Sequence, residues 1–174
     1  MKILNQSGLD ILGSIVLFTL FSIGCEKDKI SGDVVSDPQL VSELYSKSID
    51  TLSFESSDYI LEVELYRDFF PGGPVPERRP LEALIYLVNI DSLPVTENLS
   101  IIKLYVINSN QIWIANLREG VDPYIPDFKL DKLNTDGPEW ETGIYVDVII
   151  EIKNKLTMES YYVIARHQYI QRVE

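Results

Sequence analysis

A single histidine, His167, limits the catalytic chemistry that this chain of 174 residues can offer. A Ser-His-acid arrangement would need His167 beside a serine and a carboxylate, and the sequence has no nucleophile-elbow pattern. Zinc sites draw on several histidines or cysteines, so one histidine with carboxylates does not favour zinc. We therefore expect a strand-surface or core role for His167, no catalytic residue, no metal and no cofactor.

Carboxylates are too numerous for their pairing to be informative. Two of them could hydrolyse a glycosidic bond, but with 27 Asp and Glu residues some pair lies close in any fold. The segment Asn134-Thr135-Asp136-Gly137 matches the middle of an EF-hand loop. The loop's first and last positions would be Lys132 and Gly143, which lack carboxylates, so an Asx-type turn before a strand is the better interpretation. Looser calcium binding stays open.

The most unusual stretch of the chain is RDFFPGGPVPERRP, residues 67–80. Its four prolines and two glycines exclude a regular element and predict a loop. An aromatic anchor with an arginine beside it is the usual energetic centre of a contact, so Phe69, Phe70, Arg78 and Arg79 could bind a ligand or partner. The alternative is structural: one phenylalanine closes the end of the fold, and the prolines stiffen the turn.

The two tryptophans are also weighed as contact residues. Trp113 lies in a strand-like segment and is expected in the core. Trp140 lies in the loop sequence GPEWE, where a solvent-facing ring could stack on a sugar. Core packing is the alternative for Trp140.

Cys25 is the only cysteine, and it stands where a long apolar run meets a charged segment. The run from Ile11 to Ile23 would rise about 20 Å as a helix, short of the roughly 30 Å hydrocarbon core of a bilayer. A secretory signal peptide is therefore favoured over a spanning helix. One cysteine cannot close an intramolecular disulfide, and no neighbouring base lowers the pKa of its thiol. We expect Cys25 to be an anchor, with a signal lacking lipid as the alternative.

The segment Ser22-Ile23-Gly24-Cys25 resembles the lipobox of bacterial lipoproteins, in which a small residue precedes the cysteine. The resemblance implies a diacylglyceryl group on the Cys25 thiol, cleavage before Cys25 and acylation, often by palmitate, of the new amine. Several acyl chains hold a protein firmly on a membrane. The implied location is the cell envelope, in the outer membrane, with the periplasmic or surface face left open.

The charge balance restricts the partners. With 15 basic and 27 acidic residues, the formal net charge is −12. Such an excess argues against nucleic acid and against electrostatic docking on anionic lipid. A net negative charge is compatible with a water-soluble domain that a polar linker holds away from a negatively charged surface. We assign residues 1–24 to a signal peptide, 25–38 to the lipidated cysteine and a flexible linker, and 39–174 to one domain.

The elements that must position these residues are mostly strands. Apolar and polar residues alternate with a period of two in residues 59–67 and 145–153, which predicts half-buried strands. Residues 83–90 are apolar on both parities and should form a central, covered strand. Residues 101–107 and 111–117 flank a turn and predict a hairpin. Further strands are expected at 128–133 and 158–173. Residues 37–46 are expected to form a helix capped by Asp37, with an extended lead-in as the alternative.

Seven or eight short strands separated by turns predict an all-β domain. We expect an immunoglobulin-like β-sandwich, with a partly open barrel as the alternative. Segments 67–72, 137–140 and 166–170 also resemble uncharacterised bacterial lipoprotein domains expected to be immunoglobulin-like. This second resemblance implies a fold and a location but no activity.

These observations favour binding over catalysis. The leading hypothesis is a membrane-anchored accessory or interaction module of the envelope, which contacts a protein or glycan through loop 67–80 and Trp140. The alternatives are a carboxylate-dependent hydrolase of unrecognised type and a structural spacer without a specific ligand. The sequence does not predict an oligomeric state.

Overall fold

The computed structural model describes residues 32–71, 78–120 and 122–174, which form strands and one short helix. The helix is α1 (Pro38–Lys47). The strands are β1 (Asp33–Ser36), β2 (Ser48–Ile49), β3 (Thr51–Phe54), β4 (Ser57–Asp68), β5 (Leu81–Asn89), β6 (Leu99–Asn108), β7 (Gln111–Ala115), β8 (Arg118–Glu119), β9 (Lys129–Asn134), β10 (Tyr145–Asn154) and β11 (Ser160–Val173).

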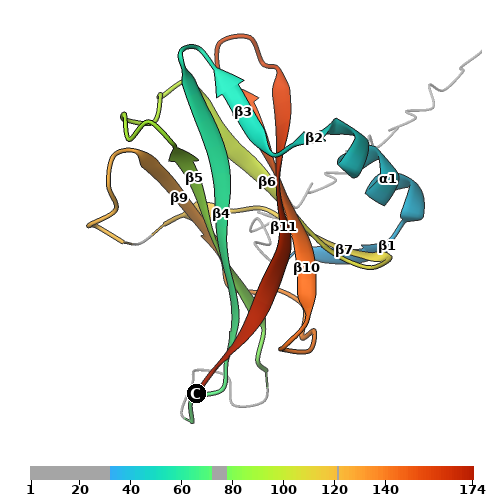
Figure 1. Cartoon of the computed structure of the whole chain (residues 1–174). Helices are drawn as coiled ribbons and strands as arrows, with labels where there is room; N and C mark the ends of the chain where they lie inside the picture. The colour runs from blue at the N-terminus through green and yellow to red at the C-terminus, as the bar shows by residue number, and fades with distance from the viewer. Residues whose placement is uncertain (1–31, 72–77, 121) are drawn as a thin grey trace, which may run out of the picture.

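All the described strands belong to one curled, mixed sheet with the order β1-β7-β6-β10-β11-β4-β5-β9-β8, in which β2 also pairs with β11 and β3 with β4. Figure 1 shows β4, β5 and β9 on one side and β6, β10 and β7 on the other. We call these the β4–β5 half and the β6–β10 half. Strand β11 joins them, since it runs antiparallel to β10 and then parallel to β4 over Ile170–Val173.

A β-bulge lets β11 pass from one half to the other. Val148 pairs with Ala165 and Val146 with Gln168, so Arg166 and His167 together lie opposite Asp147. His167 has a positive φ of 53°. The extra residue reverses which parity of β11 points inward, and such bulges bend and twist a strand.

The main core lies inside the curl. It is built from the inward parity of every long strand, because successive side chains of a strand point to opposite faces. Its buried members include Leu65, Ile85, Leu104, Trp113, Ile150 and Ile170. Trp113 is fully buried, which confirms its expected place in the core.

Helix α1 covers the outer side of the β6–β10 half. As expected, Asp37 is its N-cap, with the carboxylate accepting hydrogen bonds from the backbone N–H groups of Gln39 and Leu40 at 3.0 Å each. Leu44 is buried against a second apolar cluster on this side, together with Ile107 and Ile149.

The sequence predictions of the long strands, the 101–117 hairpin and the helix are confirmed. The all-β class is confirmed as well, as a curled mixed sheet with one short helix. Residues 33–36, assigned to the linker, form β1, which pairs with β7. No helix among the described residues is long and apolar enough to cross a membrane.

The expectation that residues 83–90 form a strand covered on both faces is wrong. Ala83 and Ile85 are fully buried inside the curl, but Leu84 and Tyr86 are only half-buried on the outer side. Tyr86 lines an open groove there. The apolar residues on both parities of β5 therefore include a surface that is partly open to solvent.

Candidate functional site

The described ends of loop 67–80 are fastened to the segment before β10 by Arg67. Its guanidinium donates hydrogen bonds to the backbone carbonyls of Arg79 and of Trp140, the latter at 2.7 Å. The hydrogen-bond partners of the Arg67 side chain are therefore backbone carbonyls of two different loops. Arg67 thus closes this end of the sheet by joining two loops.

Arg78 and Arg79 also form contacts within the chain at this end of the sheet. Arg78 forms salt bridges with Asp136 at 3.3 Å and with Glu139 at 3.7 Å, and 57% of its side chain stays exposed. The guanidinium of Arg79 donates to the carbonyl of Phe70 at 3.2 Å. Both arginines are engaged within the chain, so a partner would have to compete with these contacts.

The two phenylalanines of the loop differ. Phe69 lies between the guanidinium groups of Arg67 and Arg172, at 5.2 and 3.9 Å from its ring centroid. Such cation–π contacts hold the ring in place at the end of the fold. Phe70 has 49% of its surface exposed. Within the described part of the loop, Phe70 is the aromatic side chain that a partner could reach.

Trp140 packs against the main core while its indole N–H donates to the side chain of Gln111 at 3.1 Å. Its half-buried ring leaves little area for stacking a sugar. Asn134 accepts a hydrogen bond from the backbone N–H of Asp136 at 2.9 Å, which is the expected Asx-type turn. Cys25 lies outside the described residues.

A surface that the sequence did not single out lies on the outer side of the β4–β5 half. We call it the acidic face and define it by Glu62, Glu64, Tyr86, Asp122 and Lys129. These residues line an open groove of about 430 Å³, which is completed by Val63, Ile125 and Pro126. Its floor comes from β4 and β5 and one wall from the loop before β9.

The electrostatics of the groove centre on Tyr86. Partial burial raises the pKa of the Tyr86 hydroxyl, and the negative charges of Glu64, Asp131, Asp122 and Glu62 raise it further. The Lys129 ammonium lies 5.5 Å from the centroid of the Tyr86 ring and forms a salt bridge with Glu62. The groove therefore already holds one cation over an aromatic ring, within a field of carboxylates.

Part of this face could have been found from the sequence. Glu62 and Glu64 stand on the polar parity of β4, and Tyr86 stands on the outward parity of β5. Pairing in β4–β5 puts Tyr86 opposite Glu62, and pairing in β5–β9 puts it opposite Asp131. Period-two alternation reveals which residues share a face, but it does not reveal this register.

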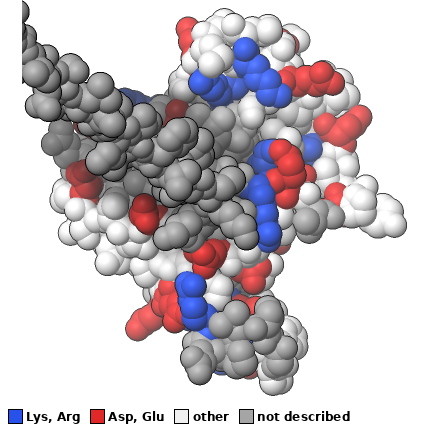
Figure 2. Space-filling view, turned by 180° about the vertical axis from the view of Figure 1, so that it is seen from behind, with Lys and Arg blue, Asp and Glu red and all other residues white. Residues whose placement is uncertain are grey.

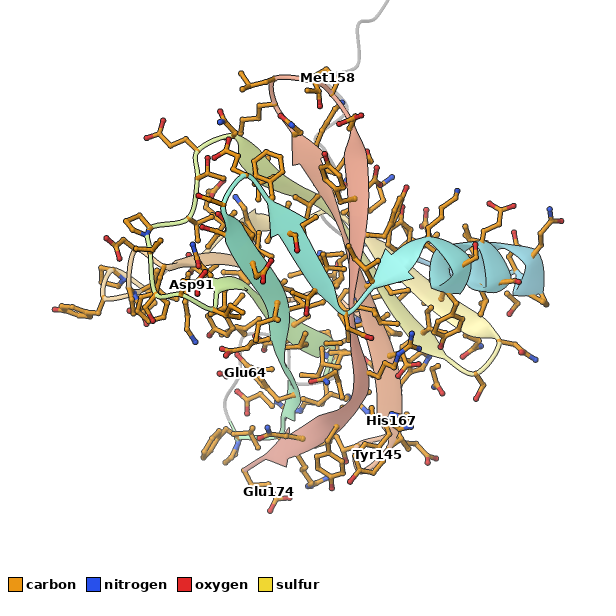
Figure 3. The ribbon with its side chains drawn as sticks, turned by 45° about the horizontal axis from the view of Figure 1, so that its top comes forward. Glu64, Asp91, Tyr145, Met158, His167 and Glu174 are labelled. Carbon is orange, nitrogen blue, oxygen red and sulfur yellow. The ribbon has the colours of Figure 1, made fainter. Side chains whose placement is uncertain are left out.

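A second hollow lies at one end of the β6–β10 half. We call it the tyrosine pocket and define it by Tyr45, Ser109, Tyr145, Asp147 and His167, which line a cavity of about 180 Å³. The Asp147 carboxylate accepts hydrogen bonds from the Tyr45 hydroxyl at 2.7 Å and from the His167 backbone N–H at 2.8 Å. Figure 3 shows Tyr145 and His167 at the same end of the sheet, away from Glu64 on β4.

His167 thus lies on the strand surface, as one of its two expected roles requires. The Asp147 carboxylate accepts a hydrogen bond from the backbone N–H of His167. In a Ser-His-acid triad the carboxylate instead bonds the imidazole ring of the histidine. A hydrolase would need acids of raised pKa that converge in a cavity. Burial raises the pKa of Glu82, but this carboxyl bonds the Tyr66 hydroxyl at 3.2 Å and does not line the groove.

The charges elsewhere are mixed. On the face seen in Figure 2, lysine and arginine side chains lie beside aspartate and glutamate side chains in several places. Among the described residues, no group of three or more His, Cys, Asp or Glu side chains could hold a metal ion.

Comparisons with known proteins give no further guide to the site. The sequence matches no protein-family model, and searches of the curated proteins and of the solved structures find no similar protein.

Proposed function

We propose that this chain is a lipid-anchored binding module of the bacterial cell envelope, attached through Cys25, with an immunoglobulin-like body. The strand order supports the fold. In immunoglobulin-like sandwiches the first, second, fifth and fourth strands form one sheet, and the remaining strands form the other. Counted from β4 with β7 left out, the orders β4-β5-β9-β8 and β6-β10-β11 have this arrangement, and β7 adds a further strand beside β6.

The observation that carries the binding function is the uneven covering of the two halves. The outer side of the β6–β10 half buries its apolar residues under α1, with Leu44 at the centre. The outer side of the β4–β5 half also carries apolar and aromatic residues, among them Leu84 and Tyr86, but these stay half-buried beside an open groove. A partner on the acidic face would complete their burial.

The charge of the acidic face indicates the chemistry of that partner. Glu64 and Asp122 line the groove and form no salt bridge within the described residues. Lys129 and Glu62 show how an ammonium is accommodated beside Tyr86. The partner is therefore a polypeptide segment rich in lysine or arginine, because opposite charges steer association and exclude partners of like charge.

Loop 67–80 is proposed as a second contact at the end of the module. Phe70 is half-exposed there, and Arg78 keeps more than half of its side chain in solvent. A flat aromatic and a nearby arginine are typical of contact centres. This contact is subordinate to the acidic face, because Arg78 and Arg79 already have partners within the chain.

The test is crosslinking in intact cells that express tagged wild-type protein, Cys25→Ala, the double variant Glu64→Lys with Asp122→Lys, and Glu43→Lys. Glu43 is exposed on α1, on the opposite side of the sheet, and its replacement by lysine gives half of the double variant's change of charge away from the acidic face. We expect one discrete partner, lost from the double variant and retained by Glu43→Lys. Purified partner should then bind the wild type with an affinity that falls steeply as salt rises.

The remaining outcomes separate the alternatives. Equal recovery by the double variant would refute the acidic face as the contact. No partner in any strain would favour a spacer. A Cys25→Ala protein that stays in the membrane would refute the lipid anchor.

A further inference from the structure

An aromatic pair stands exposed beside the tyrosine pocket. Tyr145 on β10 and Tyr169 on β11 are paired across the two strands, with ring centroids 5.3 Å apart. Tyr145 has 64% of its surface in solvent and Tyr169 has 48%. Side chains of this size normally bury most of their area, so two adjacent exposed rings form a ready contact platform.

The pocket next to this platform is lined largely by polar groups. It offers the hydroxyls of Ser109 and Tyr45, the Asp147 carboxylate and the side chain of His167. Its volume of about 180 Å³ equals that of about six water molecules in the liquid. The space suits one small polar ring and is too small for a folded peptide element.

The backbone around the pocket is built in an uncommon way. His167 adopts a φ of 53° within the bulge, and its N–H is fixed by Asp147. Left-handed φ values of non-glycine residues often mark functional sites, and bulges re-aim side chains there. Asp147 also bonds Tyr45, so α1, β10 and β11 position the pocket together.

The lining of the pocket carries one formal charge, the Asp147 carboxylate, which already accepts two hydrogen bonds. Arg166 lies outside the lining, with its guanidinium 5.6 Å from the centroid of the Tyr45 ring, and forms a salt bridge with Asp50 at 3.6 Å. The pocket thus lacks the several carboxylates that line the acidic face. A ligand here is therefore neutral and rich in hydroxyls, which can both donate to a carboxylate and accept from a side-chain N–H or O–H.

We propose that the tyrosine pocket binds one neutral sugar unit of a glycan. The C–H face of the sugar ring would lie on Tyr145, with Tyr169 extending the platform, and its hydroxyls would bond Asp147, Ser109 and His167. This site is independent of the acidic face, and it provides the aromatic platform that the sequence had suggested for Trp140.

The experiment is isothermal titration calorimetry of the purified full chain with neutral tetrasaccharides of glucose, mannose and N-acetylglucosamine. We expect at least one to bind, with Kd raised tenfold or more by Tyr145→Ala and about threefold or more by Ser109→Ala. Tyr145→Phe keeps the ring and should bind as the wild type does. Tyr124→Ala is the matched control, since Tyr124 is 89% exposed on the loop before β9 and does not line the tyrosine pocket.

Tyr145 and Tyr124 are both exposed, so their replacement by alanine should leave the fold intact. Circular dichroism of each variant checks this. Binding that is lost in Tyr145→Ala and kept in Tyr124→Ala supports the site. The absence of binding to all three sugars, or equal affinities of Tyr145→Ala and the wild type, overturns it. Neither result changes the outcome of the crosslinking test on the acidic face.

Discussion

Asp147 offers the sharpest test of how the fold is held at the point where β11 changes partners. Its carboxylate accepts hydrogen bonds from the Tyr45 hydroxyl on α1 and from the His167 backbone N–H in the bulge, at 2.7 and 2.8 Å. Asp147→Ala removes both. Hydrogen bonds to charged groups contribute about 1.5–3 kcal/mol each when buried. Because Asp147 is only half-buried and water can replace it, we expect a total loss of about 2 kcal/mol.

The assay is urea unfolding, in which the midpoint should fall while the slope stays constant. Asp147→Asn keeps an oxygen for the His167 N–H and should lose about half as much. Tyr45→Phe should cost about 1 kcal/mol in the wild type and almost nothing in Asp147→Ala. If Tyr45→Phe costs the same in both backgrounds, or if Asp147→Ala changes stability by less than about 0.5 kcal/mol, this account of the corner is refuted.

Three other outcomes can be measured on the purified domain. Gly137→Ala should lose about 1–3 kcal/mol in urea unfolding, because its Cβ would lie 2.6 Å from the Leu81 carbonyl oxygen. Arg67→Lys should raise the rate at which trypsin cleaves loop 67–80, since an ammonium cannot bond both loops as the guanidinium does. Burial raises the pKa of both Tyr45 and Tyr66 from 10 to about 12, so folding favours their protonated forms. The contribution of these two groups to the unfolding free energy should therefore be constant below pH 10 and should be lost as the pH rises from 10 to about 12. Tyr45→Phe with Tyr66→Phe should flatten that fall, and an unchanged slope would contradict the assigned environments.

Local pattern was enough to predict most elements. The alternation in residues 59–67 and 145–153 predicts β4 and β10 because each strand has one inward and one outward face. Asp37 followed by Pro38 predicts the start of α1, where both residues satisfy the requirements of a helix N-terminus. These signals depend only on residues that are close in the sequence, so they can be recognised before the fold is known.

Features that depend on distant segments were not predictable. The inward parity of β11 changes between Ala165 and Ile170, and only pairing with β10 shows that a bulge at His167 causes it. The two-residue strands β2 and β8 are too short to carry a periodic pattern. The candidate sites depend on register in the same way, since Tyr86 meets Glu62 only after β4 and β5 have paired.

Strand β1 limits how far the domain could lie from a membrane if Cys25 carries the proposed lipid. Its residues pair with β7 from Asp33 opposite Ile114 onward, and Gly32 packs so closely that a Cβ would lie 2.4 Å from the indole nitrogen of Trp113. The chain is therefore fixed to the domain from Gly32, six residues before the end assigned to the linker. An extended chain spans at most about 3.6 Å per residue, so a lipid on Cys25 would hold the start of β1 within about 25 Å of the membrane.

This short reach bears on which surfaces a partner can approach. The anchor would emerge beside β7, whereas the acidic face lies on β4 and β5, on the other side of the curled sheet (Figure 1). The anchored edge and the proposed docking face are thus separated by the body of the domain. A partner with a lysine-rich segment could reach the acidic face without displacing the anchor. A lipid on Cys25 would therefore leave the proposed binding surface accessible.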